Sequence, residues 1–120
     1  MIQQDEMRGG VKVCDLVEHL QLAVVNKGDD FDTALVGIRD VNRPGLQLVG
    51  FFDYFDPRRL QVIGMAETKM LESMEPEHRS SSFSRLFEYD IPALVVSRDL
   101  DIYPECLSMA RKHRRTLLHT

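Results

Sequence analysis

The second half of the chain alternates short apolar runs with longer stretches of helical character. The apolar runs cover residues 60–63, 93–96 and 117–118 and are rich in the β-forming residues typical of strands. The stretches between them, residues 65–92 and 98–115, each exceed the dozen residues that a crossover between parallel strands requires. This alternation predicts an α/β fold with a small, mostly parallel sheet and helices packed on it.

The run at residues 93–96 is expected to form the central strand. It is apolar without alternation, as in a parallel strand that helices cover on both faces. The stretch before it is long enough for two helices, the second starting at Pro76. The stretch after it accommodates one helix, starting near Pro104.

The first half of the chain has weaker periodicity. Residues 1–10 are polar, end in two glycines and have no period, so they are expected to form a flexible lead-in to a single domain over residues 11–120. Apolar residues at spacings of three and four then predict a short helix over residues 13–20. Two β-like runs, residues 22–25 and 35–38, are expected to pair with each other.

Composition narrows the class of protein. With 43% apolar and 28% charged residues, the chain has the make-up of an ordinary globular domain. It contains no run near the roughly 18 apolar residues of a membrane-spanning helix, and its polar start is unlike a signal peptide. We therefore expect a cytoplasmic protein with no membrane partner. Cys14 and Cys106 stand outside any C-x-x-C pair, which predicts two reduced thiols.

The net charge of −4 gives the chain no general attraction to phosphate backbones. Its one basic cluster, residues 111–115, falls in the last turn of a predicted helix, where cations complement the helix dipole. A nucleic-acid patch is the less favoured alternative, so we expect no nucleic-acid partner.

A search for catalytic motifs finds none that a stand-alone enzyme would need. No glycine precedes a Lys-Ser or Lys-Thr pair in the phosphate-binding G-x-x-x-x-G-K-[ST] frame, and the four histidines have no metal-binding spacing. Asp53 and Asp56 could divide acid and base roles, but aspartates beside aromatics and before a proline are ordinary turn residues, which we favour. We predict no catalytic residue, no metal site and no cofactor in this chain.

Residues 42–55 are the strongest candidate for a functional surface. A proline in the first turn and a glycine past the end predict a helix of about two turns over residues 42–50, although alternation of Leu46 and Leu48 keeps a strand open. Arg43 precedes the amino end of this helix, where free N–H groups attract anions. Four aromatics follow without period, Phe51, Phe52, Tyr54 and Phe55. The segment is either an anion-binding or interface site or a tight corner packed for stability.

Residues 41–55, continued by Arg59-Leu60-Gln61-Val62-Ile63-Gly64 and Glu67-Thr68, resemble the amino-terminal domain of the HPr kinase/phosphorylase family. The remainder agrees in order, from the predicted opening helix to the closing strand at residues 117–120. The resemblance covers about residues 11–120. Departures from the family pattern include Cys14 and the Ser80-Ser81-Ser82 tract.

The resemblance implies a fold similar to the amino-terminal domain of Mur ligases. The family's enzyme phosphorylates a regulatory serine of HPr, the sugar-transport phosphocarrier, with ATP or pyrophosphate and magnesium, and removes that phosphate by phosphorolysis. Both activities belong to a carboxy-terminal P-loop domain that would follow Thr120. The resemblance therefore places no catalytic residue on this chain, which should itself be inactive.

The function implied by the resemblance is that of a non-catalytic regulatory or assembly domain in carbon catabolite control of the phosphotransferase system. The implied partners are its own catalytic domain and other subunits of a homo-oligomer, with HPr reached through the absent domain. The candidate contact or ligand residues are Arg43, Phe51, Phe52, Tyr54 and Phe55. The alternative is a stand-alone small-ligand module that senses an anionic metabolite at Arg43 and the adjacent helix end.

Overall fold

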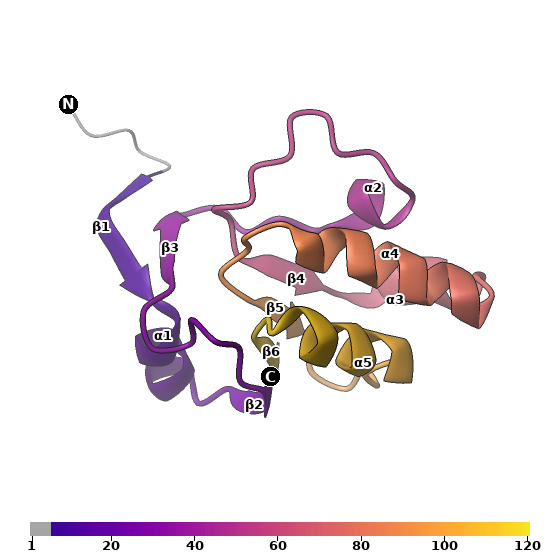
Figure 1. Cartoon of the computed structure of the whole chain (residues 1–120). Helices are drawn as coiled ribbons and strands as arrows, with labels where there is room; N and C mark the ends of the chain where they lie inside the picture. Colours follow the sequence, from indigo (N-terminus) through magenta and orange to yellow (C-terminus); the bar gives the residue numbers. More distant parts are fainter. Residues whose placement is uncertain (1–5) are drawn as a thin grey trace.

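The computed structural model describes residues 6–120, which contain a mixed four-stranded sheet (Figure 1). The strand order is β2 (Ala23–Asn26), β6 (Leu117–His119), β5 (Leu94–Val96) and β4 (Gln61–Ile63). Strand β5 pairs in parallel with both β4 and β6, whereas β2 runs antiparallel to β6. The predicted α/β class is confirmed, but the prediction of a mostly parallel sheet holds only for β4, β5 and β6.

The helices that connect the parallel strands are α3 (Met65–Glu72), α4 (Pro76–Glu88) and α5 (Pro104–His113). The predicted arrangement of two helices before β5 and one after it is confirmed. Both α4 and α5 begin with proline in the first turn, where the missing N–H removes no helical hydrogen bond. Within residues 6–120, no helix is long and apolar enough to cross a membrane.

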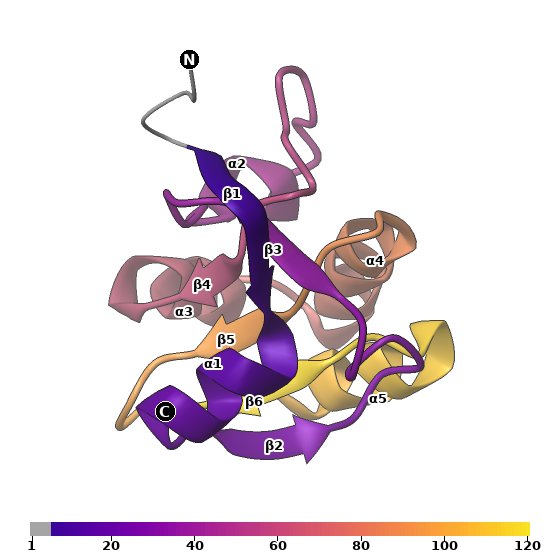
Figure 2. The same cartoon turned by 90° about the vertical axis from the view of Figure 1, so that its left-hand side faces the viewer.

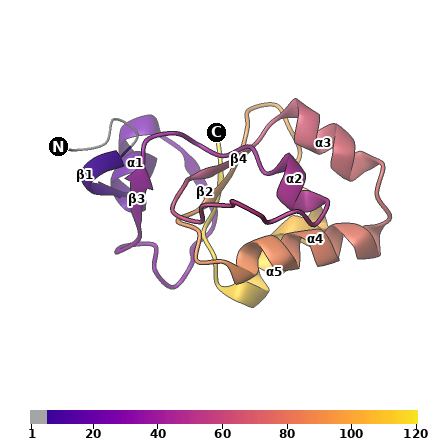
Figure 3. The same ribbon diagram turned by 90° about the horizontal axis from the view of Figure 1, so that it is seen from above.

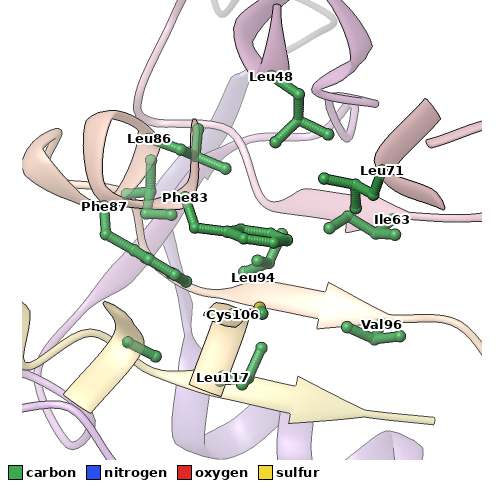
Figure 4. Packing of buried hydrophobic residues seen from close by; sticks show 12 residues of the cluster. Leu48, Ile63, Leu71, Phe83, Leu86, Phe87, Leu94, Val96, Cys106 and Leu117 are labelled. Carbon is green, nitrogen blue, oxygen red and sulfur yellow. The ribbon is translucent and has the colours of Figure 1, made fainter. Parts of the chain in front are cut away.

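Helices α4 and α5 lie side by side on one face of the sheet (Figures 1 and 3). Figure 4 shows how side chains from α4 stack onto strand side chains in the resulting core. The buried residues labelled there include Leu48, Ile63, Leu71, Phe83, Leu86, Phe87, Leu94, Val96, Cys106 and Leu117. This core anchors α2, α3, α4 and α5 on one face of the sheet.

The opposite face of the sheet is covered by α1 (Val13–Leu20) and β3 (Leu35–Ile38), as Figure 2 shows. Val13 and Val36 pack there against Val95 of β5. Because side chains alternate along a strand, Val95 faces this cluster while its neighbours face the helices α4 and α5. The prediction of a central strand covered on both faces is confirmed.

The pairing of the amino-terminal strands differs from the prediction. Strand β3 pairs antiparallel with β1 (Glu6–Lys12) in a separate two-stranded sheet, and β2 pairs with β6. The predicted pairing of residues 22–25 with 35–38 is therefore wrong. Asn26 fixes β2 beside β6 because its side-chain amide donates to the carbonyl of Arg115 at 2.8 Å.

We expected no regular structure before residue 11, and β1 begins instead at Glu6. Its register with β3 shifts between Glu6 and Val11, and Gly10 has a φ of 72°, in the left-handed region. A bulge of this kind removes the alternation that identifies a strand in a sequence. Residues 1–5 of the predicted lead-in lie outside the described residues.

The basic cluster at residues 111–115 has local partners. Three of its basic residues lie in the last turn of α5, as predicted. Arg115 donates from Nε to the carbonyl of Phe87 at 2.8 Å and from Nη1 to Asp90 at 2.9 Å. Both cysteines are free thiols, as predicted, and burial raises the pKa of Cys106.

Candidate functional site

Helix α2 (Gly45–Leu48) and the following loop form the site that the sequence singled out. The helix has one turn rather than the predicted two, and Leu48 anchors it in the core. The loop between α2 and β4 projects from the body of the domain (Figures 1 and 2).

Two of the four predicted aromatics pack against the domain itself. Phe52 stacks on Tyr89 with ring centroids 4.8 Å apart, and Phe55 meets both rings edge-on. The Arg85 guanidinium covers Phe52 at 5.4 Å from its centroid. The sequence pattern gave no signal for Tyr89 because it follows α4, more than thirty residues along the chain. These rings fix the base of the loop.

The other two aromatics, Phe51 and Tyr54, face solvent. Their exposed fractions are 45% and 102%, and Tyr54 has a φ of 63°, in the left-handed region. Leu46 and Val49 are exposed beside them, and the backbone N–H groups of Val49 and Phe51 both donate to the carbonyl of Leu46. Leu46, Val49, Phe51 and Tyr54 together form what we call the α2 surface.

The guanidinium of Arg43 binds Glu67 of α3. Its Nε and Nη2 donate to Glu67 Oε1 at 2.9 and 2.7 Å, and the same oxygen accepts from the backbone N–H of Gly64 at 2.7 Å. The first N–H of the one-turn helix α2 donates back to the carbonyl of Arg43. The structure therefore brings Arg43 together with α3, and the guanidinium that was expected to attract an anion is already paired with a carboxylate.

A cavity of about 310 Å³ lies between the α2 surface and the loop base. Rings of Phe51, Tyr54 and Phe55 line it. Its polar lining residues are Asn42, Gln47, Asp53, Asp56 and Arg59. Of the predicted site residues, this cavity gathers three aromatics and excludes Arg43 and Phe52.

A chain of hydrogen-bonded amide side chains lies beside this cavity, and two of its members, Asn42 and Gln47, line it. Asn42 Nδ2 donates to Gln47 Oε1 at 3.0 Å and to Gln61 Oε1 at 2.6 Å. Gln47 and Gln61 are both buried. The backbone of Asn42 also pairs in parallel with the outer edge of β4. These hydrogen bonds hold the three amides together, and no local sequence pattern marks them because they come from three separate segments.

Arg59 and Asp56 have different environments in the same cavity. The Nε atom of Arg59 is buried without a hydrogen-bond partner among the described residues. Asp56 accepts from Arg58 Nε at 3.0 Å and Nη2 at 2.9 Å, and this pairing lowers the pKa of the aspartate. Asp56 is therefore held as a carboxylate by Arg58, consistent with the turn role favoured from sequence, while Arg59 Nε has no acceptor within residues 6–120.

A second cavity, of about 370 Å³, lies between α3 and the loop at residues 99–104. It opens near the carboxyl ends of β4 and β5, and its charged lining residues are Lys69, Glu72, Asp99 and Asp101. None of the predicted site residues lines it. Among residues 6–120, no three histidine, cysteine, aspartate or glutamate side chains are grouped to hold a metal ion.

Comparison with known proteins identifies relatives across nearly the whole domain. The family described as "HPr Serine kinase N terminus" matches residues 11–120. The HPr kinase/phosphorylase of Clostridium perfringens (strain SM101 / Type A) is 40% identical over 111 residues, and that of Clostridium tetani (strain Massachusetts / E88) is 44% identical over 111 residues. Each alignment covers 92% of this chain and 36% of the relative, so the chain spans about a third of the length of these relatives.

A solved structure of similar fold comes from a different kind of protein. It contains the CBS and DRTGG domains of the regulatory region of a Clostridium perfringens pyrophosphatase, complexed with the activator diadenosine tetraphosphate. The TM-score is 0.60 at 14% sequence identity, over 98% of this chain and 46% of that one. This likeness concerns the fold alone, and the expected similarity to Mur ligases stays a prediction.

The predicted family resemblance is confirmed by a family match over residues 11–120 and by relatives about 40% identical over 92% of the chain. This chain belongs to the family of HPr serine kinase amino-terminal domains.

Proposed function

We propose that this chain is a non-catalytic regulatory or assembly domain of an HPr serine kinase/phosphorylase that acts in carbon catabolite control of the phosphotransferase system. The observation that supports the proposal most strongly is Tyr54, a fully exposed aromatic held in the left-handed backbone region. A bulky residue in that conformation costs about 1–2 kcal/mol of stability. Since its side chain is fully exposed, its contribution is expected outside the domain.

The α2 surface is the proposed contact surface. Its four apolar side chains are each at least 45% exposed. Removal of such side chains from water is favourable, so a partner that covers this surface would be stabilised by it. Aromatic side chains are also the most frequent anchors of protein interfaces. In the same loop, the rings of Phe52 and Phe55 pack edge-on against each other.

The proposed partners are the catalytic part of the same enzyme and other subunits of a homo-oligomer. The relatives extend well beyond the length of this chain, which leaves room for a P-loop domain that uses ATP or pyrophosphate and magnesium. In this proposal HPr is reached through that domain, in the cytoplasm. Arg43 contributes by fixing the segment before α2 rather than by touching the partner.

The proposed absence of catalysis is tested with the 120-residue chain itself. We expect neither saturable binding of magnesium-ATP by calorimetry nor transfer of labelled phosphate to HPr, because the backbone cradle and lysine that position phosphates are absent from the sequence. Binding together with turnover would contradict the proposal.

A second candidate function is that of a small-ligand module for an anionic metabolite. The cavity of about 310 Å³ favours it, because the cationic side chain of Arg59 lines this cavity together with aromatic rings. The similar fold in the regulatory region of a pyrophosphatase agrees with a regulatory use of this architecture. From the sequence we expected such a site at Arg43, whereas Arg59, and not Arg43, lines the cavity.

A further inference from the structure

The α2 surface has an exposed ring and a cavity side by side. The Tyr54 side chain is 102% exposed and borders the cavity of about 310 Å³ that Leu46, Phe51 and Phe55 also line. We propose that two copies of this chain associate through the α2 surface about a two-fold axis, with the Tyr54 ring of each copy seated in the cavity of the other. This inference rests on the proposed assembly function and names the partner of that surface.

The cavity has room for an aromatic ring. A cavity of about 150 Å³ is already large enough to bind benzene, so a volume of about 310 Å³ can hold a tyrosine side chain. Phe51 and Phe55 border the cavity, and aromatic rings pack on one another edge-on or offset-stacked. Phe55 is fixed by its packing against Phe52 and Tyr89. One side of the cavity is therefore formed before a partner ring enters.

The polar part of the lining matches the other end of a tyrosine side chain. A tyrosine hydroxyl that becomes buried needs a hydrogen-bond partner. Asp53 and Asp56 line the cavity, and a carboxylate accepts the hydrogen bond of a hydroxyl. The cavity thus offers both the rings and the acceptors that the side chain of Tyr54 requires.

The arrangement on one chain favours a second copy over a different protein. A two-fold contact places the same patch of both copies face to face, so a ring and a cavity that lie next to each other are matched twice. The unfavourable backbone of Tyr54, with a φ of 63°, is then compensated in both copies. A different partner would have to supply both a matching ring and a matching cavity.

Charge and shape allow two copies to approach in this way. Residues 53–59 contain two aspartates and two arginines, so this part of the loop has no net charge to repel its own copy. By contrast, the basic cluster at residues 111–115 would repel itself across a two-fold axis. The loop between α2 and β4 projects from the body of the domain, so two loops can meet before the bodies collide (Figures 1 and 2).

The test is sedimentation equilibrium of the 120-residue chain. The α2 surface is small for a specific interface, so we expect a monomer–dimer equilibrium with a dissociation constant of about 100 μM. Tyr54→Ala should raise this constant about a hundredfold or more, because two buried anchors are lost in each dimer. Leu46→Trp should also weaken the dimer, since a larger side chain takes up volume that the partner ring needs. The control Leu20→Ala removes an exposed apolar side chain of α1 and should leave the constant unchanged.

A mixture of the two variants tests whether the contact is reciprocal. The Tyr54→Ala chain keeps the cavity and the Leu46→Trp chain keeps the ring, so their heterodimer has one intact contact and each homodimer has none. The mixture should therefore associate about tenfold more tightly than either variant alone. Equal association of the mixture and the separate variants would overturn the proposal, as would open assemblies larger than a dimer.

Tyr54→Gly separates a role in the interface from a role in folding. Glycine adopts a positive φ readily, so the Tm of the dilute monomer should stay the same or rise while dimerisation is lost. A clear fall in Tm, or a wild-type chain that stays monomeric up to about 1 mM, would contradict the two-fold contact. If the wild-type chain is monomeric but Tyr54 variants still lower the assembly mass of a full-length relative that carries this domain, the proposed assembly function stands with another partner. If neither effect is seen, both proposals are wrong.

Discussion

The guanidinium of Arg43 donates two hydrogen bonds to a single carboxylate oxygen of Glu67, from Nε at 2.9 Å and from Nη2 at 2.7 Å. The Glu67 side chain is 7% exposed and that of Arg43 is 50% exposed, so the pair is partly shielded from water. The same oxygen accepts from the N–H of Gly64 at the start of α3. The ion pair thus ties the segment before α2 to the first turn of α3.

Arg43→Ala is expected to lower the free energy of unfolding by about 1–2 kcal/mol, because it leaves the carboxylate of Glu67 with one remaining hydrogen bond. Gly64→Ala should have a similar effect, since its Cβ would lie 2.3 Å from Arg43 Nη2 and displace the guanidinium. Urea denaturation of both single variants and the double variant should show that the two losses are not additive. Arg98→Ala is the control for the loss of an arginine. If the losses of Arg43→Ala and Gly64→Ala add fully in the double variant, the two residues do not act through the same contact.

Val95→Asp is expected to prevent folding. Val95 is 4% exposed in the interior strand and packs against α1 and β3, so a carboxylate there would lose its water without gaining a partner. Val24→Asp is the matched control, since Val24 lies in edge strand β2 and is 42% exposed. Circular dichroism should show an unfolded Val95→Asp chain and a folded Val24→Asp chain, and a folded Val95→Asp chain would mean that β5 is misplaced.

Asp56 gives the chain a predictable response to acid. Hydrogen bonds from Arg58 lower its pKa below the ordinary 3.8, so the stabilisation is complete above pH 3.8 and disappears as the pH falls through the lower folded value. Burial raises the pKa of Asp30, so this residue changes stability with pH in the opposite direction. The contribution of Asp30 is the same in wild type and variant and cancels in the comparison. Thermal melts between pH 7 and about pH 3 should show a shallower acid loss for Asp56→Asn. Equal slopes would contradict the Arg58 pairing.

The part of the fold that could be predicted from sequence is the part with local signals. The strands β4, β5 and β6 coincide with short runs rich in apolar residues, and Pro76 and Pro104 mark the starts of α4 and α5. The pairing of β2 with β6 joins segments some ninety residues apart and depends on contacts such as that of Asn26 with Arg115. No local pattern reports such a contact.

The candidate site was predictable in the same partial way. The run of aromatics after α2 was visible in the sequence, and two of its members, Phe51 and Tyr54, are exposed in the structure. Which rings pack depends on Tyr89, a residue distant in sequence. Arg59 could not be distinguished from other arginines because its buried Nε results from the packing of the loop.

The most direct test of the proposed assembly role is sedimentation velocity of a chimera in which residues 11–120 of this chain replace the matching segment of the Clostridium perfringens relative. The variant combines Phe51→Ser and Tyr54→Ser, and Leu20→Ser is the control, since Leu20 is 57% exposed on α1 at the other end of the domain. The α2 surface predicts a lower assembly mass for the double variant alone, with an unchanged or higher Tm because Phe51 and Tyr54 contribute little to the core. An unchanged assembly mass, or a double variant that unfolds, would contradict the proposed assembly role of the α2 surface.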